Sequence, residues 1–236
     1  MKTLIDGRSY QAALHMGAMR RPQHTGRRLN EFLAMVEEAL GEPARISDLC
    51  LTAERLAGVD LLVILTRRRD DPAFRFSPEE HEGIDGHLTA GGALLLMTNH
   101  APFAENDRKL IAKIAGPYGV SVHGRTGFRA QSETRVGAAD IGFHAITELV
   151  SALYFRNSHI LTCRPHESVS ILATIPGLPA PNNVFALAID GTGRIVLAAD
   201  SGFIADESNE PDTGYINCED NRRFIRQSLE WLCDKR

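Results

Sequence analysis

Short apolar segments recur along the first half of the chain. Leu61–Leu65 and Ala93–Met97 are continuously apolar, a pattern typical of parallel strands that are covered on both faces. Lys2–Gly7 is a similar segment that closes with an aspartate and a glycine, and a further strand is expected around Ala44–Leu49. These segments predict the strands of one buried sheet.

Helical periodicity fills the intervals between the predicted strands. Apolar side chains at i, i+3, i+4 and i+7 predict a helix over residues 29–40, which Gly41 ends. Ser77-Pro78-Glu79-Glu80 opens another helix, because it combines an N-cap serine, a proline at the first helical position and a glutamate three residues after the cap. A helix follows residues 93–97, and a final helix is expected to be capped near Asp220. This alternation predicts an α/β fold, a flavodoxin-like three-layer sandwich with a mostly parallel central sheet.

The pattern changes in the second half of the chain. Between about residues 117 and 181, short β-forming segments and turns replace the alternation, and we expect a β-rich insertion there. Val184–Asp190 and Arg194–Asp200 then follow, and the Asp-Gly turn between them predicts a hairpin. We expect a single domain over residues 1–236, since this length suits one large α/β domain.

Composition narrows the class of protein. The chain is 43% hydrophobic and 24% charged, which excludes a disordered, collagenous or coiled-coil protein. Its formal net charge of −4 does not favour nucleic acid or an anionic membrane surface as a partner. Widely spaced cysteines and the absence of a signal sequence predict a cytoplasmic protein with free thiols. The apolar neighbours of Cys50 predict that this thiol is buried.

Candidate functional residues lie where the predicted strands end. Ligands of an open parallel sheet bind outside the carboxyl ends of its strands, because the strand-to-helix loops meet there. Seven polar residues of this kind are candidates for ligand binding or catalysis: Asp6, Arg8, Thr98, Asn99, His100, Asp200 and Ser201.

Each of these residues has two interpretations. His100 is placed to act as a general base, to donate to an oxyanion or to bind a metal, or it hydrogen-bonds within its own turn. Asp200 and Ser201 either orient a base and hold a ligand hydroxyl or cap a turn. Asp6 is either a ligand-binding residue or the anchor of its loop.

Several common motifs are absent from the sequence. No glycine pattern of a dinucleotide or P-loop site is present, and no cofactor is assigned. No pair of histidines has metal-binding spacing, although a metal site assembled from His100 and distant carboxylates stays open. Arginines in the first loop and in Arg67-Arg68-Arg69 either bind an anion or form a solvated basic face, which Asp70-Asp71 partly neutralises.

Four stretches of the chain resemble a known superfamily. They are "LAGVDLLVIL", "GGALLLMTNHAPF", "GRIVLAADSGF" and "DNRRFIRQSLEWL". Together they resemble the class I glutamine amidotransferase-like superfamily. The similarity is greatest to a branch without glutaminase activity, which includes domains of unknown function and the homologous domains of gliding-motility and intraflagellar-transport proteins. The resemblance extends from Lys2 to about Leu232.

The resemblance implies the fold and the place of the pocket but no glutaminase chemistry. In glutaminases of the superfamily, a cysteine in a glycine-flanked elbow follows the equivalent strand, and a His-x-Glu pair follows a later one. Thr98 occupies the nucleophile position here, or Asn99 if the register differs by one, and Leu96 and His100 replace the glycines. Asp200-Ser201 replaces the His-x-Glu pair. Thioester chemistry is therefore excluded.

Three classes of function remain. The leading hypothesis is a cytoplasmic, non-glutaminase protein that binds a small polar molecule, such as a sugar or carboxylate, at the strand ends. The second is a hydrolase in which His100 is the general base or a metal ligand and Asp200 orients it or shares the metal. The third is a protein-interaction module of a larger assembly, and the superfamily also suggests a homo-oligomer. A deep polar pocket favours the first two classes, whereas a flat apolar patch favours the third.

Overall fold

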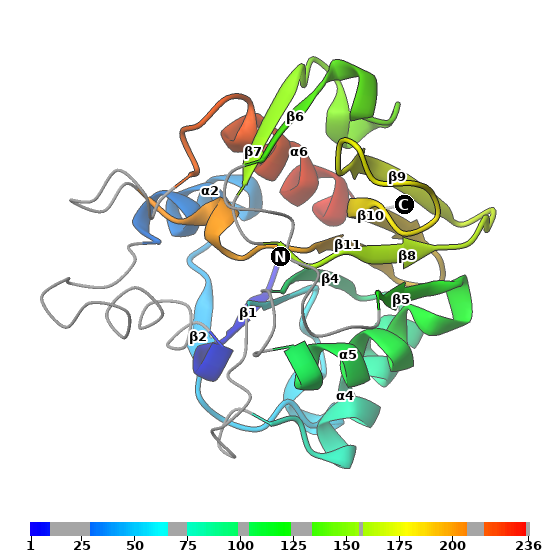
Figure 1. The fold of residues 1–236 in the computed structure, drawn as a ribbon. Coiled ribbons are helices and arrows are strands. Elements are labelled where there is room, and N and C mark those ends of the chain that lie inside the picture. Colours follow the sequence, from blue (N-terminus) through cyan, green and yellow to red (C-terminus); the bar gives the residue numbers. More distant parts are fainter. Residues whose placement is uncertain are drawn as a thin grey trace, which may run out of the picture.

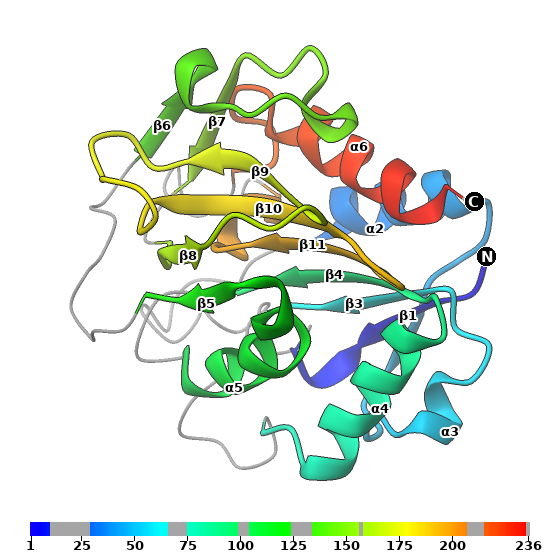
Figure 2. The same ribbon diagram turned by 90° about the vertical axis from the view of Figure 1, so that its right-hand side faces the viewer.

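A computed structural model describes residues 1–9, 29–65, 75–98, 104–123, 134–155, 158–206 and 215–234. In this part of the chain, nine strands form one sheet, which lies between two layers of helices (Figures 1 and 2). The flavodoxin-like three-layer α/β fold is confirmed. The strands of this sheet are β1 (Thr3–Asp6), β2 (Arg45–Ser47), β3 (Leu61–Ile64), β4 (Ala93–Met97), β5 (Val120–Val122), β8 (Leu161–Cys163), β9 (Val169–Thr174), β10 (Val184–Asp190) and β11 (Arg194–Ala198).

The parallel strands are neighbours in the order β2-β1-β3-β4-β11. β10 then pairs antiparallel with β11, and β8, β9 and β5 continue the sheet beyond it. β3 and β4 are buried along their whole length, as their continuous apolar sequences predict. The carboxyl ends of β1, β3, β4 and β11 therefore lie along one edge of the sheet, which we call the carboxyl edge.

Helices cover both faces of the sheet. Figure 2 shows α2 (Asn30–Leu40) and α6 (Asn221–Cys233) on one face, and α3 (Ala53–Leu56), α4 (Pro78–Thr89) and α5 (Ala104–Ile114) on the other. Short 3-10 helices occur at η2 (Gly116–Tyr118), η3 (Ala138–Asp140), η4 (Ala145–Thr147) and η5 (Gly202–Ile204). None of the helices in the described part of the chain has the length and apolar character of a membrane-spanning segment.

The β-rich insertion is confirmed. It contributes β5, β8 and β9 to the main sheet, and its strands β6 (Thr134–Gly137) and β7 (Ala152–Phe155) form a separate antiparallel pair. Phe155 of β7 stacks on Phe185 of β10 with a centroid distance of 3.8 Å. Phe203 and Phe224 continue this aromatic cluster to α6. The insertion therefore packs onto the main sheet through buried aromatic rings.

The hairpin of β10 and β11 has the predicted turn, with Asp190 opposite Arg194 in the register. Gly193 is required there because a Cβ atom at this position would lie 2.6 Å from the Leu88 carbonyl oxygen and 2.5 Å from that of Gly92. The turn therefore packs directly on the end of α4.

One local expectation holds only in part, and another is wrong. Asp220 is the N-cap residue of α6, as expected. The side chain of Asp220 does not cap α6; it accepts hydrogen bonds from the Ser151 amide at 2.8 Å, the Ser151 hydroxyl at 2.7 Å and the Ala152 amide at 3.2 Å. The Asp220 carboxylate therefore binds the start of β7 and not the first amides of α6, which are the partners that the sequence suggests. Cys50 is exposed rather than buried, because it follows the edge strand β2 and only its neighbour Leu51 turns inward.

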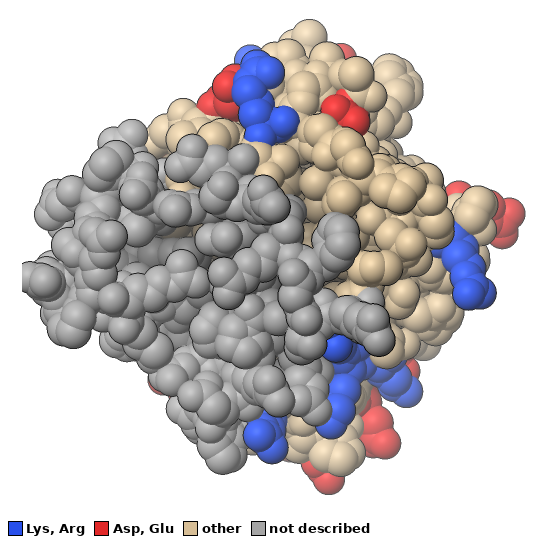
Figure 3. Space-filling model, in the orientation of Figure 1, with Lys and Arg blue, Asp and Glu red and all other residues tan. Residues whose placement is uncertain are grey.

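The surface carries charges of both signs. On the described part of the face in Figure 3, acidic side chains lie near basic ones. One such pair joins the insertion to the segment before α6, where Arg135 Nε donates to Glu219 Oε1 at 2.8 Å. Exposed pairs of this kind contribute little to stability, because water and salt screen their charges.

Candidate functional site

The carboxyl edge gathers five of the seven candidate residues. Asp6 ends β1, Thr98 follows β4, and Asp200 and Ser201 follow β11. All four are at most 1% exposed, and Arg8 lies just beyond Asp6. Buried polar side chains cost free energy unless they find partners, so the partners of each residue indicate its role.

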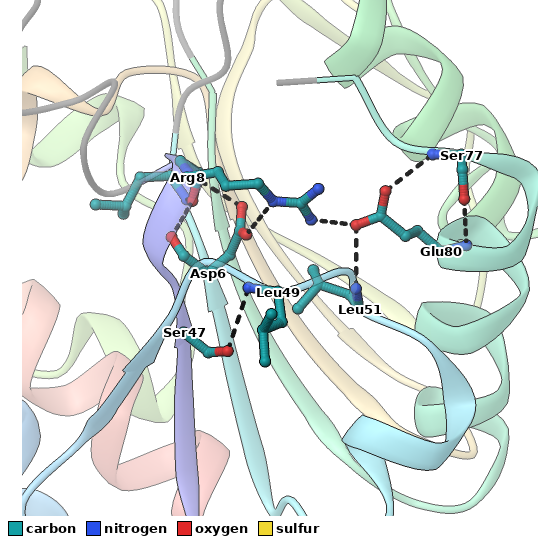
Figure 4. Close-up of polar contacts among 9 residues, drawn as sticks. Asp6, Arg8, Ser47, Leu49, Leu51, Ser77 and Glu80 are labelled. Atoms are coloured by element: carbon teal, nitrogen blue, oxygen red, sulfur yellow. Dashed lines mark hydrogen bonds and ion pairs between the residues drawn. The ribbon is translucent and has the colours of Figure 1, made fainter. Parts of the chain in front are cut away.

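Asp6 and Arg8 belong to a buried ion-pair network with Glu80 of α4 (Figure 4). Arg8 Nε lies 3.4 Å from Asp6 Oδ1, and its terminal nitrogen donates to Glu80 Oε1. The side chains of Arg8 and Glu80 are 14% and 2% exposed. The carboxylates of Asp6 and Glu80 therefore balance the positive charge of the Arg8 guanidinium group, which is largely shielded from bulk water.

Glu80 has three further contacts in this network. Its oxygens accept the amides of Leu51 and Ser77, each at 3.0 Å, and its own amide donates to the Ser77 hydroxyl at 3.2 Å. The capping box expected from the sequence is thus present. The same glutamate also joins α4 to the loop after β1 and to the segment after β2.

The network favours the charged forms of Arg8 and Glu80. Burial opposes ionisation of Glu80, but hydrogen bonds from Arg8 and from the amides of Ser77 and Leu51 outweigh it and lower its pKa. Burial also opposes the charge of Arg8, but the hydrogen bond to Glu80 and the charge of Asp6 raise its pKa. Arg8 is therefore a permanent cation whose charge is already paired.

Ser9 completes this half of the carboxyl edge. Its amide donates to Asp6 Oδ2 at 3.2 Å, and its hydroxyl donates to the Asp6 carbonyl oxygen at 2.9 Å. The same hydroxyl accepts the Leu65 amide at 3.1 Å, which joins the ends of β1 and β3. Asp6 therefore makes the contacts of a loop anchor, one of the two roles expected for it.

The other half of the carboxyl edge lies where β4 meets β11. The Thr98 amide donates to the Ala198 carbonyl oxygen at 2.9 Å, and the His159 amide donates to that of Ala199 at 2.9 Å. These bonds place Thr98 and the Ser158-His159 pair beside the end of β11. Asp200 Oδ1 accepts the Gly202 amide at 2.7 Å, which is the turn-capping contact that its sequence allows.

Two buried hydroxyls in this half have no hydrogen-bond partner among the described residues. They belong to Thr98 and Ser158, whose side chains are 0% exposed. An unpartnered buried hydroxyl costs about 1–3 kcal/mol, and such groups in native proteins call for a specific explanation such as a bound molecule. These two hydroxyls make this half of the carboxyl edge the candidate binding site.

Asp206 is a further buried carboxylate near this edge, 7% exposed. It accepts the amides of Asn30 at 2.8 Å and Glu31 at 3.0 Å, so it caps α2 from a distant part of the chain. This contact satisfies amides at the start of α2, where the preceding residue Leu29 provides no side-chain cap.

Sequence reasoning missed three residues of the edge: Glu80, Ser158 and His159. Glu80 was recognised only as a helix cap, and its spacing of 72 residues from Arg8 gives no signal of their contact. Ser158 and His159 lie in the insertion, where no strand-end pattern singles them out. Asn99 and His100 lie outside the described residues. In the described part of the chain, no group of three metal-ligating side chains is found.

The comparisons with known proteins identify the fold. No protein-family model matches the chain. No curated protein matches it either. Among the similar solved structures, the N-terminal domain of mmIFT52 has a TM-score of 0.67 and 14% sequence identity, and the match covers 99% of this chain and 98% of that one. A ThuA-like protein from Bacteroides uniformis has a TM-score of 0.63 and 12% identity, with coverages of 100% and 92%. A GMP synthase subunit from Thermoplasma acidophilum has a TM-score of 0.51 and 14% identity, with coverages of 99% and 94%.

At these identities the similarity concerns the fold alone. The ThuA-like protein and the protein from Thermoplasma acidophilum support the mixed α/β fold expected from the sequence. Fold similarity does not carry function.

Proposed function

We propose that this protein binds a small polar molecule, a sugar or a carboxylate, at the half of the carboxyl edge formed by β4 and β11. In this proposal it belongs to the branch of the glutamine amidotransferase-like superfamily that lacks the catalytic cysteine. Thr98 and Ser158 offer hydroxyls to the ligand, and Asp200 and Ser201 lie at the end of the adjacent strand.

The Thr98 hydroxyl is the observation that carries the proposal. It is fully buried, it stands directly after a central parallel strand, and it has no partner among the described residues. Ligands of open α/β sheets bind at this position relative to the strands. A ligand that hydrogen-bonds this hydroxyl would remove the free-energy cost of leaving it unpaired.

The absence of a cysteine after β4 supports a protein without glutaminase activity. Thr98 stands where the resemblance places the nucleophile, and the four cysteines of the chain lie elsewhere: Cys50, Cys163, Cys218 and Cys233. All four are free thiols, which suits the reducing cytoplasm that we propose as its location.

A second candidate is a protein-interaction module. Two large apolar side chains project from the insertion: Phe143 is fully exposed, and Leu149 is 77% exposed with a left-handed backbone, φ 58°. Large apolar side chains that project into solvent from one short segment are candidates for a contact with another protein. This candidate requires no small ligand at the carboxyl edge.

A thermal-shift measurement tests the leading proposal. Wild-type protein and Thr98→Val are melted with a panel of monosaccharides and of di- and tricarboxylates. A ligand at about 100 times its Kd stabilises the wild type by about 2.7 kcal/mol, a rise of roughly 5–10 °C in Tm. Without ligand, Thr98→Val melts at or above the wild-type temperature, because the substitution removes an unpartnered hydroxyl. With ligand, its shift is reduced or lost.

Thr89→Val is the matched control. Thr89 is exposed at the end of α4, on the opposite edge of the sheet, so this variant keeps the wild-type response. A ligand shift that is equally large in Thr98→Val contradicts the proposed site. If no compound of the panel changes the Tm of the wild type, the small-ligand proposal is wrong and the protein-interaction module takes its place.

A further inference from the structure

A concave site lies away from the half of the carboxyl edge that is formed by β4 and β11. It is a cleft of about 600 Å³ between the edge strand β2, the start of β1 and the short helix α3. Its wall includes Ser47, Leu49 and Leu51, which Figure 4 shows beside the ion-pair network. A volume of about 300–1,000 Å³ is usual for sites that bind small molecules. Neither Thr98 nor Asp200 lines this cleft.

Cationic side chains line the cleft without ion-pair partners. Lys2, Arg45 and Arg55 form no salt bridge among the described residues, in contrast to Arg8. The cleft also includes Glu42 and Glu54, so its three cations exceed its anions by one charge. Unpaired arginines in a concave site favour a carboxylate or a phosphate, which a guanidinium group binds with two parallel hydrogen bonds.

Apolar side chains lie next to these cations. Leu4 is opposite Arg45 in the register of β1 and β2, so the two side chains share one face of the sheet. Leu49, Leu51 and Val59 extend the apolar part of the wall, and Leu49 is 47% exposed. A ligand that fits this arrangement has an anionic group and an aliphatic body.

We propose that this cleft binds a small aliphatic carboxylate. Arg45 and Arg55 hold the carboxylate group, and the hydrocarbon chain packs against Leu4, Leu49 and Leu51. The proposal is independent of the site at the carboxyl edge, and the two sites have separate readouts.

Cys50 provides the readout for the cleft. It lines the cleft and is exposed, whereas Cys163 is buried and Cys218 lies elsewhere in the fold. A ligand in the cleft covers the Cys50 thiol and slows its alkylation. The neutral reagent iodoacetamide avoids a charge effect on the rate, and peptide mass spectrometry resolves each cysteine separately.

The experiment measures the alkylation rate of Cys50 with hexanoate, acetate or inorganic phosphate at matched ionic strength. Hexanoate at about ten times its Kd is expected to slow the alkylation of Cys50 about tenfold and to leave the rate at Cys218 unchanged. Acetate and phosphate at the same concentration protect much less, because they lack the aliphatic body. Equal protection by phosphate overturns the aliphatic part of the proposal.

Variants test the arginines. The double variant Arg45→Ala, Arg55→Ala is expected to lose the hexanoate protection of Cys50. Arg164→Ala removes an exposed arginine outside the cleft and keeps the protection. Circular dichroism and Tm of each variant show that it is folded. Unchanged protection in the double variant, or no protection of Cys50 by hexanoate in the wild type, overturns the proposal.

Discussion

Both halves of the carboxyl edge contain buried polar groups, but the halves differ in how these groups are paired. At the ends of β1 and β3, Asp6, Arg8 and Glu80 compensate one another, and Ser9 both donates and accepts. At the ends of β4 and β11, the hydroxyls of Thr98 and Ser158 have no partner among the described residues. Burial alone therefore does not mark a binding site; the pairing state of the buried groups separates a structural cluster from a candidate site.

The paired half holds three separate segments together. Glu80 receives hydrogen bonds from the loop after β1, from the segment after β2 and from the start of its own helix. A buried ion pair offsets its desolvation cost only when such additional hydrogen bonds are present. This cluster accordingly positions the loop after β1, and the unpaired half is the one that we propose for ligand binding.

The largest predicted effect is the loss of Glu80. Glu80→Ala leaves the buried Arg8 with Asp6 as its one carboxylate in the network and removes the acceptor for two amides. Removing one partner of a buried pair costs about 3–5 kcal/mol, which urea denaturation measures as a lower midpoint. Glu82→Ala, at an exposed position of the same helix, is the control and leaves the midpoint unchanged. A cost for Glu80→Ala below about 1 kcal/mol contradicts a structural role for the paired half.

Acidification gives a second and smaller effect on the same half. Because the folded-state pKa of Glu80 is lowered, its contribution to stability is complete above its unfolded pKa of about 4.3. It is lost as the pH falls through the lower folded-state value. The free energy of unfolding of the wild type therefore declines more steeply below pH 5 than that of Glu80→Gln. Parallel pH profiles for the two proteins would show that Glu80 is not the responsible group.

The smallest predicted effect compares two buried serines, one in each half. Ser158→Ala removes a hydroxyl without a partner among the described residues and is expected to stabilise the protein by up to about 1 kcal/mol. Ser9→Ala removes a hydroxyl with two hydrogen bonds and is expected to destabilise it by about 1–3 kcal/mol. Chemical denaturation of both variants measures the difference. If both substitutions raise the free energy of unfolding, or both lower it, the proposed difference between the two halves is wrong.

Much of the fold was predictable because its signals are local in the chain. The continuous apolar segments of β3 and β4, the capping box at Ser77 and the glycine that ends α2 act within a few residues. The β-rich insertion was recognisable for the same reason. The capping of α6 was not, since the Asp220 carboxylate binds the Ser151 amide 69 residues away.

The sequence predicted where the candidate site lies, but it did not predict which of its polar groups are hydrogen-bonded or ion-paired. The rule that strands of a parallel sheet end at one edge placed Asp6, Arg8, Thr98, Asp200 and Ser201 together from their sequence positions. It did not show that Glu80 would compensate Arg8, or that the segment of Ser158 and His159 would lie beside the end of β11. These contacts depend on which strands become neighbours and on how α4 packs against the sheet.

The sequence by itself determined the elements of this protein, their α/β order and the edge of the sheet where polar residues collect, because apolar periodicity and capping act over short distances. Only the tertiary structure decided which buried polar groups are paired. Pairing depends on atoms brought together from distant parts of the chain: the guanidinium of Arg8 meets the carboxylate of Glu80, whereas no described group meets the hydroxyl of Thr98. A buried polar group stabilises the fold when such an atom reaches it, and it remains available to a ligand when none does.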